Sequence, residues 1–186
     1  MKVVAIIPAR GGSKRLKEKN IYPIWDKPMI YWAIDACKKS KYNIQPWVST
    51  ENEKIKQVSA KFGAKIHDRE PELAEDHVYK QAAIRSAAQY IFNDQQKPDI
   101  VISLQANSPQ IESKHIDDAI DVLLKHNRDE VFSVDSNLMQ NAAFRVFRGE
   151  YVFQRDLSTN CGVVVCELHD VHTVEDVDFI SKNTTR

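Results

Sequence analysis

The fold is decided near the start of the chain, by the stretch Val3-Val4-Ala5-Ile6-Ile7-Pro8-Ala9-Arg10-Gly11-Gly12-Ser13-Lys14-Arg15. A short, continuous apolar run of this kind is typical of a strand that is buried on both faces. A loop with two adjacent glycines and several cations follows it directly, and Pro28 then marks the start of a helix. The order of strand, loop and helix predicts an α/β fold with a ligand-binding loop after the first strand.

The same alternation continues along the chain. We expect further strands at 45–49, 64–67, 100–104 and 131–134, and helices at 28–40, 50–62, 76–92 and 113–126. Five strand-helix alternations predict a mostly parallel sheet with helices on both faces. Because such sheets bind ligands at the carboxyl ends of their strands, the loops after residues 7, 49, 67, 104 and 134 are the places to look for function.

The pattern changes after about residue 140. Phe144–Phe147 and Tyr151–Phe153 flank Arg148-Gly149-Glu150, which predicts a hairpin. A β-branched strand at 162–166 and a final helix at 173–181 follow it. The length of 186 residues and the lack of a linker or repeat fit a single domain, 1–186, with the hairpin region at about 136–160.

Composition limits the class of function. The 26 Lys and Arg residues balance 26 Asp and Glu residues, so the net charge gives no support to a nucleic-acid binder. Cys37, Cys161 and Cys166 have no metal-ligand spacing and are expected to be reduced thiols. We see no signal peptide, and no apolar run approaches the roughly 20 residues that cross a bilayer. The expectation is a cytoplasmic protein without a membrane partner.

The chemistry of the first loop points to phosphate. Five cations lie within ten residues, at positions 10, 14, 15, 17 and 19, and Ser13 adds a hydroxyl donor. Adjacent glycines let backbone amides approach an anion, and clustered cations suit a triphosphate. The loop has neither the GxxxxGK[ST] nor the GxGxxG spacing. The alternative is a solvated basic surface loop without a ligand.

At these residues the chain resembles the acylneuraminate cytidylyltransferases, the CMP-sialic acid or CMP-nonulosonate synthetases. The resemblance covers about residues 1–135, with weaker matches beyond. It rests on an ordered set of motifs: Ile7-Pro8-Ala9-Arg10-Gly11-Gly12-Ser13-Lys14, Lys19-Asn20-Ile21, Lys27-Pro28-Met29-Ile30, Val48-Ser49-Thr50, Arg69-Glu70-Pro71-Glu72-Leu73-Ala74-Glu75-Asp76, Leu104-Gln105-Ala106-Asn107-Ser108-Pro109 and Asn160-Cys161-Gly162.

The resemblance implies a fold, a reaction and a set of site residues. Such enzymes have a Rossmann-like sheet of the nucleotide-diphospho-sugar transferase type, are usually homodimers, and join CTP to a nonulosonic acid with Mg²⁺ while releasing pyrophosphate. Arg10, Lys14 and Lys19 would then be catalytic, and Gln105 and Asn107 would bind the sugar acid. The residues expected at the nucleotide are Arg10, Gly11, Gly12, Ser13, Lys14, Lys19, Asn20 and Arg69.

The chain departs from the family pattern at the metal site. The family carries Asp-x-Asp before its last helix, whereas this chain has Asp170-Val171-His172. Mg²⁺ prefers oxygen ligands, and imidazole suits transition metals better. Three readings stay open: Asp170 suffices with phosphate oxygens and water, Asp176 or Asp178 takes part, or the site is altered. A transition-metal cluster of His169, Asp170 and His172 is a weaker possibility.

The second departure is length, because residues 136–160 are shorter than the family segment that completes the sugar pocket. Phe144, Arg145, Arg148, Gln154 and Arg155 are candidates there, and an Arg could pair with the sugar carboxylate. The expected acceptor is N-acetylneuraminate, legionaminate or pseudaminate. Two alternatives remain: a nucleotidyltransferase for another base or sugar, and a nucleotide-binding protein with a degenerate metal site and no turnover.

Overall fold

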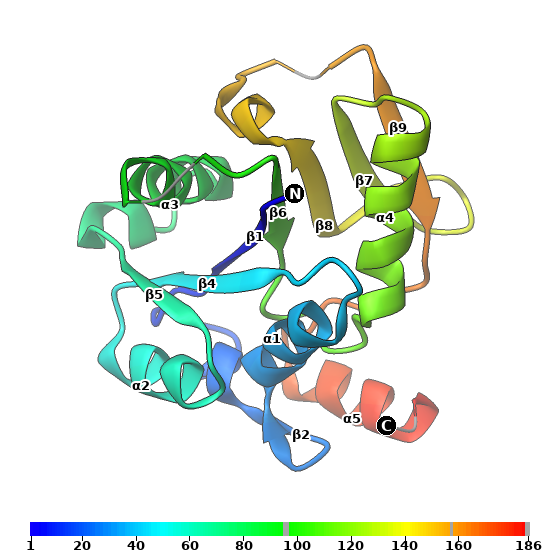
Figure 1. Ribbon diagram of the computed structural model, residues 1–186. Helices are drawn as coiled ribbons and strands as arrows, with labels where there is room; N and C mark the ends of the chain where they lie inside the picture. The colour runs from blue at the N-terminus through cyan, green and yellow to red at the C-terminus, as the bar shows by residue number, and fades with distance from the viewer. Residues whose placement is uncertain (95–96, 157, 185–186) are drawn as a thin grey trace.

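The computed structural model describes residues 1–94, 97–156 and 158–184. Its centre is a seven-stranded sheet in the order β5-β4-β1-β6-β8-β7-β9 (Figure 1). The strands of this sheet are β1 (Val3–Pro8), β4 (Gln45–Thr50), β5 (Lys65–Asp68), β6 (Ile100–Leu104), β7 (Glu130–Val134), β8 (Gln140–Arg148) and β9 (Cys161–Val165). A separate two-stranded sheet is formed by β2 (Pro23–Ile24) and β3 (Lys27–Pro28).

The helices and short 3-10 turns connect these strands. The α-helices are α1 (Met29–Lys39), α2 (Glu53–Lys61), α3 (Lys80–Asp94), α4 (Ser113–Lys125) and α5 (Val174–Asn183). The 3-10 helices are η1 (Lys19–Ile21), η2 (Pro71–Ala74) and η3 (Gly149–Phe153). The predicted Rossmann-like, mostly parallel sheet is confirmed, because β5, β4, β1 and β6 are parallel neighbours and β9 runs parallel to β7.

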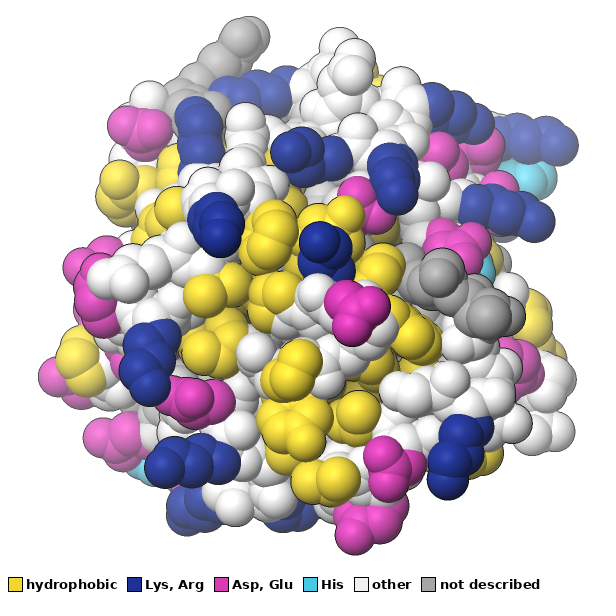
Figure 2. Space-filling model, turned by 90° about the horizontal axis from the view of Figure 1, so that it is seen from below, with side chains coloured by type: hydrophobic (Ala, Val, Ile, Leu, Met, Phe, Trp, Pro, Cys, Tyr) yellow, Lys and Arg dark blue, Asp and Glu magenta, His cyan; other side chains and the backbone are white. Residues whose placement is uncertain are grey.

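Alternate side chains of β1 enter two different cores, as expected for a central strand. Ala5 and Ile7 pack in the core shared with α1 and α4, whereas Val4 and Ile6 pack against α3 on the opposite face. A third cluster lies under α5, where Val177 and Ile180 meet Trp32 of α1 and apolar residues near β2 and β3. Hydrophobic side chains also gather on the outer face of this region, among charged residues (Figure 2).

The predicted hairpin around Arg148-Gly149-Glu150 is wrong. Residues 140–148 form β8, which pairs antiparallel with β6 and with β7. Tyr151–Phe153 is not a returning strand, because it lies in η3. There Val152 is buried in the α3 core and Phe153 contacts Phe92 at a ring distance of 5.1 Å. Packing against α3 therefore outweighs the local hairpin signal.

The helix predicted at 76–92 begins four residues later, at Lys80. Residues 75–79 form a connecting turn, in which Val78 N donates to Glu75 O at 3.1 Å. Side-chain contacts of Asp76 with the loop after β1 hold this connector. The correction matters for function, because the connector lies at the carboxyl edge of the sheet.

Among the described residues, no helix is long and apolar enough to cross a membrane.

Candidate active site

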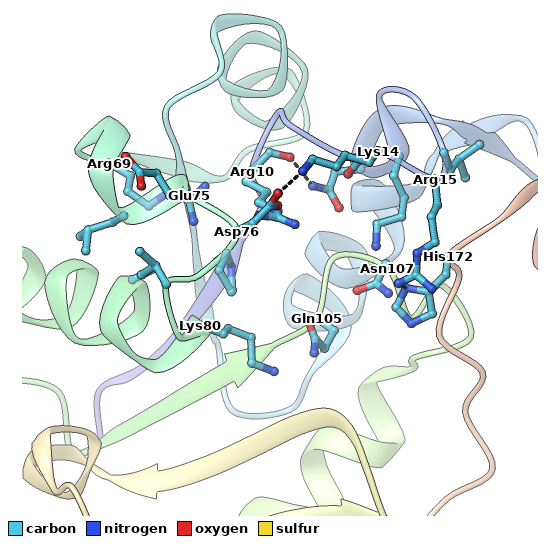
Figure 3. Close-up of a pocket in the computed structure, with 18 residues that line it drawn as sticks. Arg10, Lys14, Arg15, Arg69, Glu75, Asp76, Lys80, Gln105, Asn107 and His172 are labelled. Atoms are coloured by element: carbon cyan, nitrogen blue, oxygen red, sulfur yellow. Dashed lines mark hydrogen bonds and ion pairs between the residues drawn. The ribbon is translucent and has the colours of Figure 1, made fainter.

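A cleft of about 470 Å³ opens at the carboxyl ends of the parallel strands (Figure 3). Its walls come from the loop after β1, from the segment between Arg69 and Lys80, and from the loop after β6. The predicted site residues that line it are Arg10, Ser13, Lys14, Lys19, Asn20, Arg69, Gln105, Asn107 and His172. Gly11, Gly12 and Asp170 are not among its lining residues.

The loop after β1 is held in shape by contacts inside the protein. Ser13 N donates to Gly11 O at 3.0 Å, which makes a tight turn. The buried Asn20 donates from Nδ2 to the carbonyl oxygen of Arg10 at 2.9 Å. One amide hydrogen of Asn20, which we expected to serve a phosphate, is thus used to fix the loop. The loop is therefore shaped before any ligand arrives.

The two glycines differ in what they do. A Cβ at Gly11 would lie 2.4 Å from Asn52 Nδ2, so only glycine allows this close approach. The Gly11 amide was expected to face the phosphates of a nucleotide, but it donates to the protein's own carboxylate, Glu51 Oε1, at 2.6 Å. A Cβ at Gly12 would meet no described atom within 4 Å. Gly11 thus shapes the loop, whereas nothing around Gly12 requires a glycine.

Asp76 pairs with two of the cations of this loop. Its Oδ1 lies 2.7 Å from Arg10 Nη1, and its Oδ2 forms an ion pair with Lys14 Nζ. Figure 3 shows the three side chains meeting across the cleft between the loop and the 75–79 connector. Arg10 Nη1 also donates to Ala74 O at 3.3 Å. The hydrogen bonds from Lys14 and Arg10 hold the pKa of Asp76 below its usual range, so the carboxyl is an anion.

A second acid, Glu51, joins the loop to Arg69. Arg69 Nη2 donates to Glu51 Oε2 at 2.5 Å, while Oε1 accepts the Gly11 amide. Burial alone would raise the pKa of Glu51, but the bonds from Arg69 and Gly11 outweigh it and lower that pKa. The Arg69 side chain is only 4% exposed, and its Nε finds no hydrogen-bond partner among the described residues. Arg69 thus lines the cleft while its guanidinium is held in place by Glu51.

Two lysines of the cleft form no ion pair within the described part of the chain, Lys19 and Lys80. Burial lowers the pKa of Lys19, and nearby Arg15 and Arg10 lower it further while Asp170 opposes them. Burial also lowers the pKa of Lys80, with Asp170 and Arg145 as its charged neighbours. The Lys80 side chain is nonetheless exposed to the open cleft, where it points toward Gln105 (Figure 3). An anionic ligand would relieve the cost of holding both charges in partly dehydrated places.

Of the two expected metal residues, His172 lines the cleft and Asp170 does not, and each already has a partner within the protein. Asp170 accepts a hydrogen bond from Ser108 Oγ, and His172 Nδ1 lies 3.2 Å from Arg15 Nη2. Burial, together with Lys19 and Arg15, lowers the pKa of His172, so its ring is neutral at pH 7. Because an Arg can only donate, Nδ1 is the acceptor and is not free for a metal. In residues 1–94, 97–156 and 158–184 there is no group of three His, Cys, Asp or Glu side chains arranged to hold a metal ion.

Two of the open readings of the metal site can be tested against these contacts. Asp176 caps α5: its Oδ2 accepts from the backbone of His172 at 2.8 Å and of Thr173 at 2.9 Å. Its Oδ1 lies 3.0 Å from His169 Nε2. Both carboxylate oxygens of Asp176 therefore have partners at the start of α5, and one of these partners is the His169 ring. Among the described residues, His169, Asp170 and His172 do not form the transition-metal cluster that the sequence left open.

Asn107 has a structural contact as well as a place in the cleft. Its Nδ2 donates to Val171 O at 3.0 Å, and Val171 N donates back to Asn107 O at 2.8 Å. These bonds fasten the loop after β6 to the segment before α5. Gln105 is held by its backbone, since Gln105 N donates to Ala143 O at 2.9 Å, and its side chain faces the cleft. Of the two expected sugar-binding residues, Gln105 has the freer side chain.

Three charged residues of the site have no role in the sequence-based prediction: Glu51, Asp76 and Lys80. Glu51 directly follows a strand end, a signal that could have drawn attention to it. Asp76 and Lys80 were hidden by the early helix start, because a helix over 76–92 would have carried both into its first turns. Their place in the cleft depends on the 75–79 connector, which no local pattern predicts.

The fold and the cleft together define an α/β protein of the nucleotidyltransferase fold. A solved CMP:2-keto-3-deoxy-manno-octonic acid synthetase, complexed with CTP, matches with a TM-score of 0.77 at 16% identity, over 98% of each chain. Rv0371c of Mycobacterium tuberculosis H37Rv, in complex with manganese, matches with a TM-score of 0.70 at 13% identity, over 99% of this chain and all of that one. At these identities the likeness concerns the fold alone.

The sequence gives the family. The family model described as cytidylyltransferase matches residues 4–174, and the chain belongs to that family. It is 36% identical over 132 residues to N-acylneuraminate cytidylyltransferase A of Danio rerio, covering 71% of this chain and 30% of that protein. It is 31% identical over 134 residues to pseudaminic acid cytidylyltransferase of Campylobacter jejuni, covering 72% of this chain and 58% of that protein. The matched region thus spans about a third to just over half of these relatives.

Proposed function

We propose that this protein joins CTP to a 2-keto-3-deoxy sugar acid, a nonulosonic acid, to give the CMP-sugar and pyrophosphate. The observation that carries the proposal is the cleft, in which the cations of the first loop meet Arg69 and Gln105 at the carboxyl edge of a parallel sheet. The family membership and the relatives named for neuraminate and pseudaminate transfer support the same reaction.

In this reaction a sugar hydroxyl attacks the α-phosphate, and the bond from that phosphorus to the bridging oxygen breaks as pyrophosphate leaves. The protein has little covalent work to do, so it acts by positioning and by neutralising charge. Arg10, Lys14 and Lys19 would bind the β- and γ-phosphates and stabilise the departing pyrophosphate. Arg69 would contact the nucleotide from the cleft wall, and Gln105 would hold sugar hydroxyls as both donor and acceptor.

We further propose that a divalent cation, Mg²⁺, takes part. When bound, such a cation adds charge neutralisation at the phosphate oxygens. The donor set fits a hard cation held by one carboxylate, because Mg²⁺ commonly keeps several waters and uses substrate phosphates as further ligands. Asp170 is the carboxylate that would hold it, since its charge acts on both Lys19 and Lys80 of the cleft. Asp176 and His172 are committed to other partners.

The proposal is tested by pyrophosphate release with CTP, Mg²⁺ and a panel of nine-carbon and eight-carbon 2-keto-3-deoxy acids. Turnover is expected with at least one nine-carbon acid, and Arg10→Ala should abolish it while the fold survives. Because Arg10 is part-exposed, circular dichroism should show the variant to be folded. No release with any acid, or wild-type rates in Arg10→Ala, would contradict the proposed reaction.

We also propose a homodimer. β9 is an edge strand, and its Val163 and Val165 side chains are 42% and 55% exposed on one face. A second copy covering this edge would bury them. Val165→Lys should then convert a dimer into a monomer in light scattering after size exclusion, whereas Val174→Lys on α5 serves as the matched exposed control. A monomeric wild-type protein would refute the dimer.

One observation favours a second function. His172 Nδ1 is bound to Arg15, so Asp170 is the one carboxylate left for a metal in the segment Asp170–His172. Without a complete metal site the chain could bind a nucleotide and not turn it over. Thermal shift with CTP, UTP, GTP and ATP separates the possibilities, because only a bound nucleotide stabilises the fold. Stabilisation by CTP with no pyrophosphate release from any acid would favour the binding protein. Preference for another nucleotide would favour a transferase of another base.

A further inference from the structure

The phosphate end of the cleft already contains an anion, the carboxylate of Asp76. Its two oxygens each contact a different cation, Arg10 Nη1 at 2.7 Å and Lys14 Nζ. Both cations belong to the loop that the proposed function assigns to the triphosphate. Asp76 itself comes from the short connector between η2 and α3, not from the loop. The connector therefore delivers a negative charge to the place where a phosphate is expected.

A phosphate and this carboxylate compete for the same donors. A phosphate oxygen on Arg10 Nη1 would lie within a few ångströms of Asp76 Oδ1, and both groups are acceptors with negative charge. The guanidinium also donates to Ala74 O at 3.3 Å, so Arg10 is held both by the end of η2 and by the connector. Arg10 and Lys14 thus cannot give a triphosphate their full hydrogen bonding while Asp76 keeps its own.

The ion pairs of Asp76 with Arg10 and Lys14 are also of a kind that another anion can replace. Side chains of Asp76, Arg10 and Lys14 are 49%, 39% and 80% exposed, and ion pairs at such exposure hold weakly. The connector is short and flanked by separate elements, and inside it Val78 N donates to Glu75 O and the exposed His77 Nδ1 lies 3.3 Å from Glu75 Oε2. A polyanion with several charges gains more from the two cations than one carboxylate does.

We propose that Asp76 is an internal stand-in for phosphate, which neutralises Arg10 and Lys14 in the empty cleft and is displaced when a triphosphate binds. Asp76 is then a determinant of nucleotide affinity that acts against binding, and the 75–79 connector moves off the loop as the ligand enters. The inference rests on the proposed function for the identity of the ligand, but its test needs neither the nucleobase nor turnover.

The test uses inorganic tripolyphosphate, titrated calorimetrically into the full chain at fixed ionic strength. Asp76→Asn should bind it roughly three- to tenfold more tightly than wild type, because two weak pairs no longer need to break. Asp76→Ala should show the same direction. Glu72→Gln is the matched control, since it removes the same charge from an exposed site on neighbouring η2, outside the cleft lining. It should change affinity less than twofold, because distant surface charges are screened.

Hydrogen exchange supplies a second measurement. Tripolyphosphate should speed exchange of the backbone amides of residues 75–79 in the wild type, since displacement releases the connector. Weaker or unchanged binding by both Asp76 variants would overturn the inference, and so would slower exchange at 75–79. If the wild type binds no tripolyphosphate, the phosphate role of the loop fails together with the inference. If it binds and the Asp76 variants gain nothing, only the stand-in role fails.

Discussion

Replacing Glu51 by Gln tests whether a buried acid holds the phosphate loop and Arg69 together. Its Oε1 accepts the Gly11 amide at 2.6 Å and its Oε2 accepts Arg69 Nη2 at 2.5 Å. Gln keeps the size but turns one acceptor into a donor, which would face the guanidinium. The positive charge of Arg69, whose side chain is 4% exposed, would then lie buried without its counterion.

The burial of Arg69 sets how much stability the substitution should cost. Removing one partner of a buried ion pair costs about 3–5 kcal/mol, and we expect the low end because the Glu51 side chain is 20% exposed. For a chain of this size each 1 kcal/mol shifts the melting temperature by about 2–4 °C, so Glu51→Gln should melt roughly 6–12 °C below the wild type. Differential scanning calorimetry at pH 7 gives the number directly.

Glu53→Gln is the control, because Glu53 is a nearby acid whose side chain is 71% exposed. It should change stability by no more than about 0.5 kcal/mol. A fall of less than about 2 °C in Glu51→Gln would refute the idea that the Glu51–Arg69 pair stabilises this edge of the sheet.

The Glu51–Arg69 pair also predicts how the stability of the protein changes at low pH. The pKa of Glu51 is lowered in the folded protein from its ordinary 4.5, so its contribution is fully present above pH 4.5 and is lost as pH falls through the lower folded value. The difference in melting temperature between wild type and Glu51→Gln should therefore narrow on acidification below pH 4.5. A difference that stays constant there would show that the ionised carboxylate is not the cause.

Three further substitutions test the loop after β1 and the expected metal residues. Gly11→Ala should destabilise the protein by about 1 kcal/mol or more, since the new Cβ would displace Asn52, the N-cap of α2, whereas Gly12→Ala should leave the melting temperature unchanged; equal effects of the two would contradict the close-approach argument. His172→Asp should lower the Mg²⁺ concentration needed for half-maximal turnover, because it adds an oxygen ligand near Asp170; an unchanged requirement would mean that position 172 does not reach the metal.

The sheet could be predicted because its strands carry their own signal. β1 is a continuous apolar run, and β6 is apolar apart from Ser103; the structure buries all but the last residue of β1 and every residue of β6. The end of β1 also pointed to the edge of the sheet where the cleft lies, since the loop after it lines that cleft. Local patterns sufficed here because burial on both faces of a parallel strand requires an apolar residue at almost every position.

The wrong predictions share a physical cause, which is contact between residues distant in sequence. The turn that precedes α3 brings Asp76 to Arg10, which lies 66 positions away along the chain. Tyr151–Phe153 forms part of η3 and packs against a hydrophobic surface of α3. Contacts distant in sequence also surround Asp170 and His172, whose place at a metal stays a prediction: Asp170 accepts from Ser108, and His172 lies against Arg15. The hydrophobic pattern of the sequence around a residue gives no information about such distant partners.

Glu51 and Asp76 carry the same charge and face cations of the same cleft, yet their surroundings give them opposite roles. The Glu51–Arg69 pair is buried and also holds a backbone amide of the loop, so a ligand cannot replace it without undoing the loop. The Asp76 pairs are exposed and come from a connector, so a ligand can replace them. If only total charge mattered, removing either acid would strengthen tripolyphosphate binding. The contacts predict instead that Asp76→Asn strengthens it and Glu51→Gln weakens it, and binding that moves the same way in both variants would show that bulk charge outweighs the geometry of the cleft.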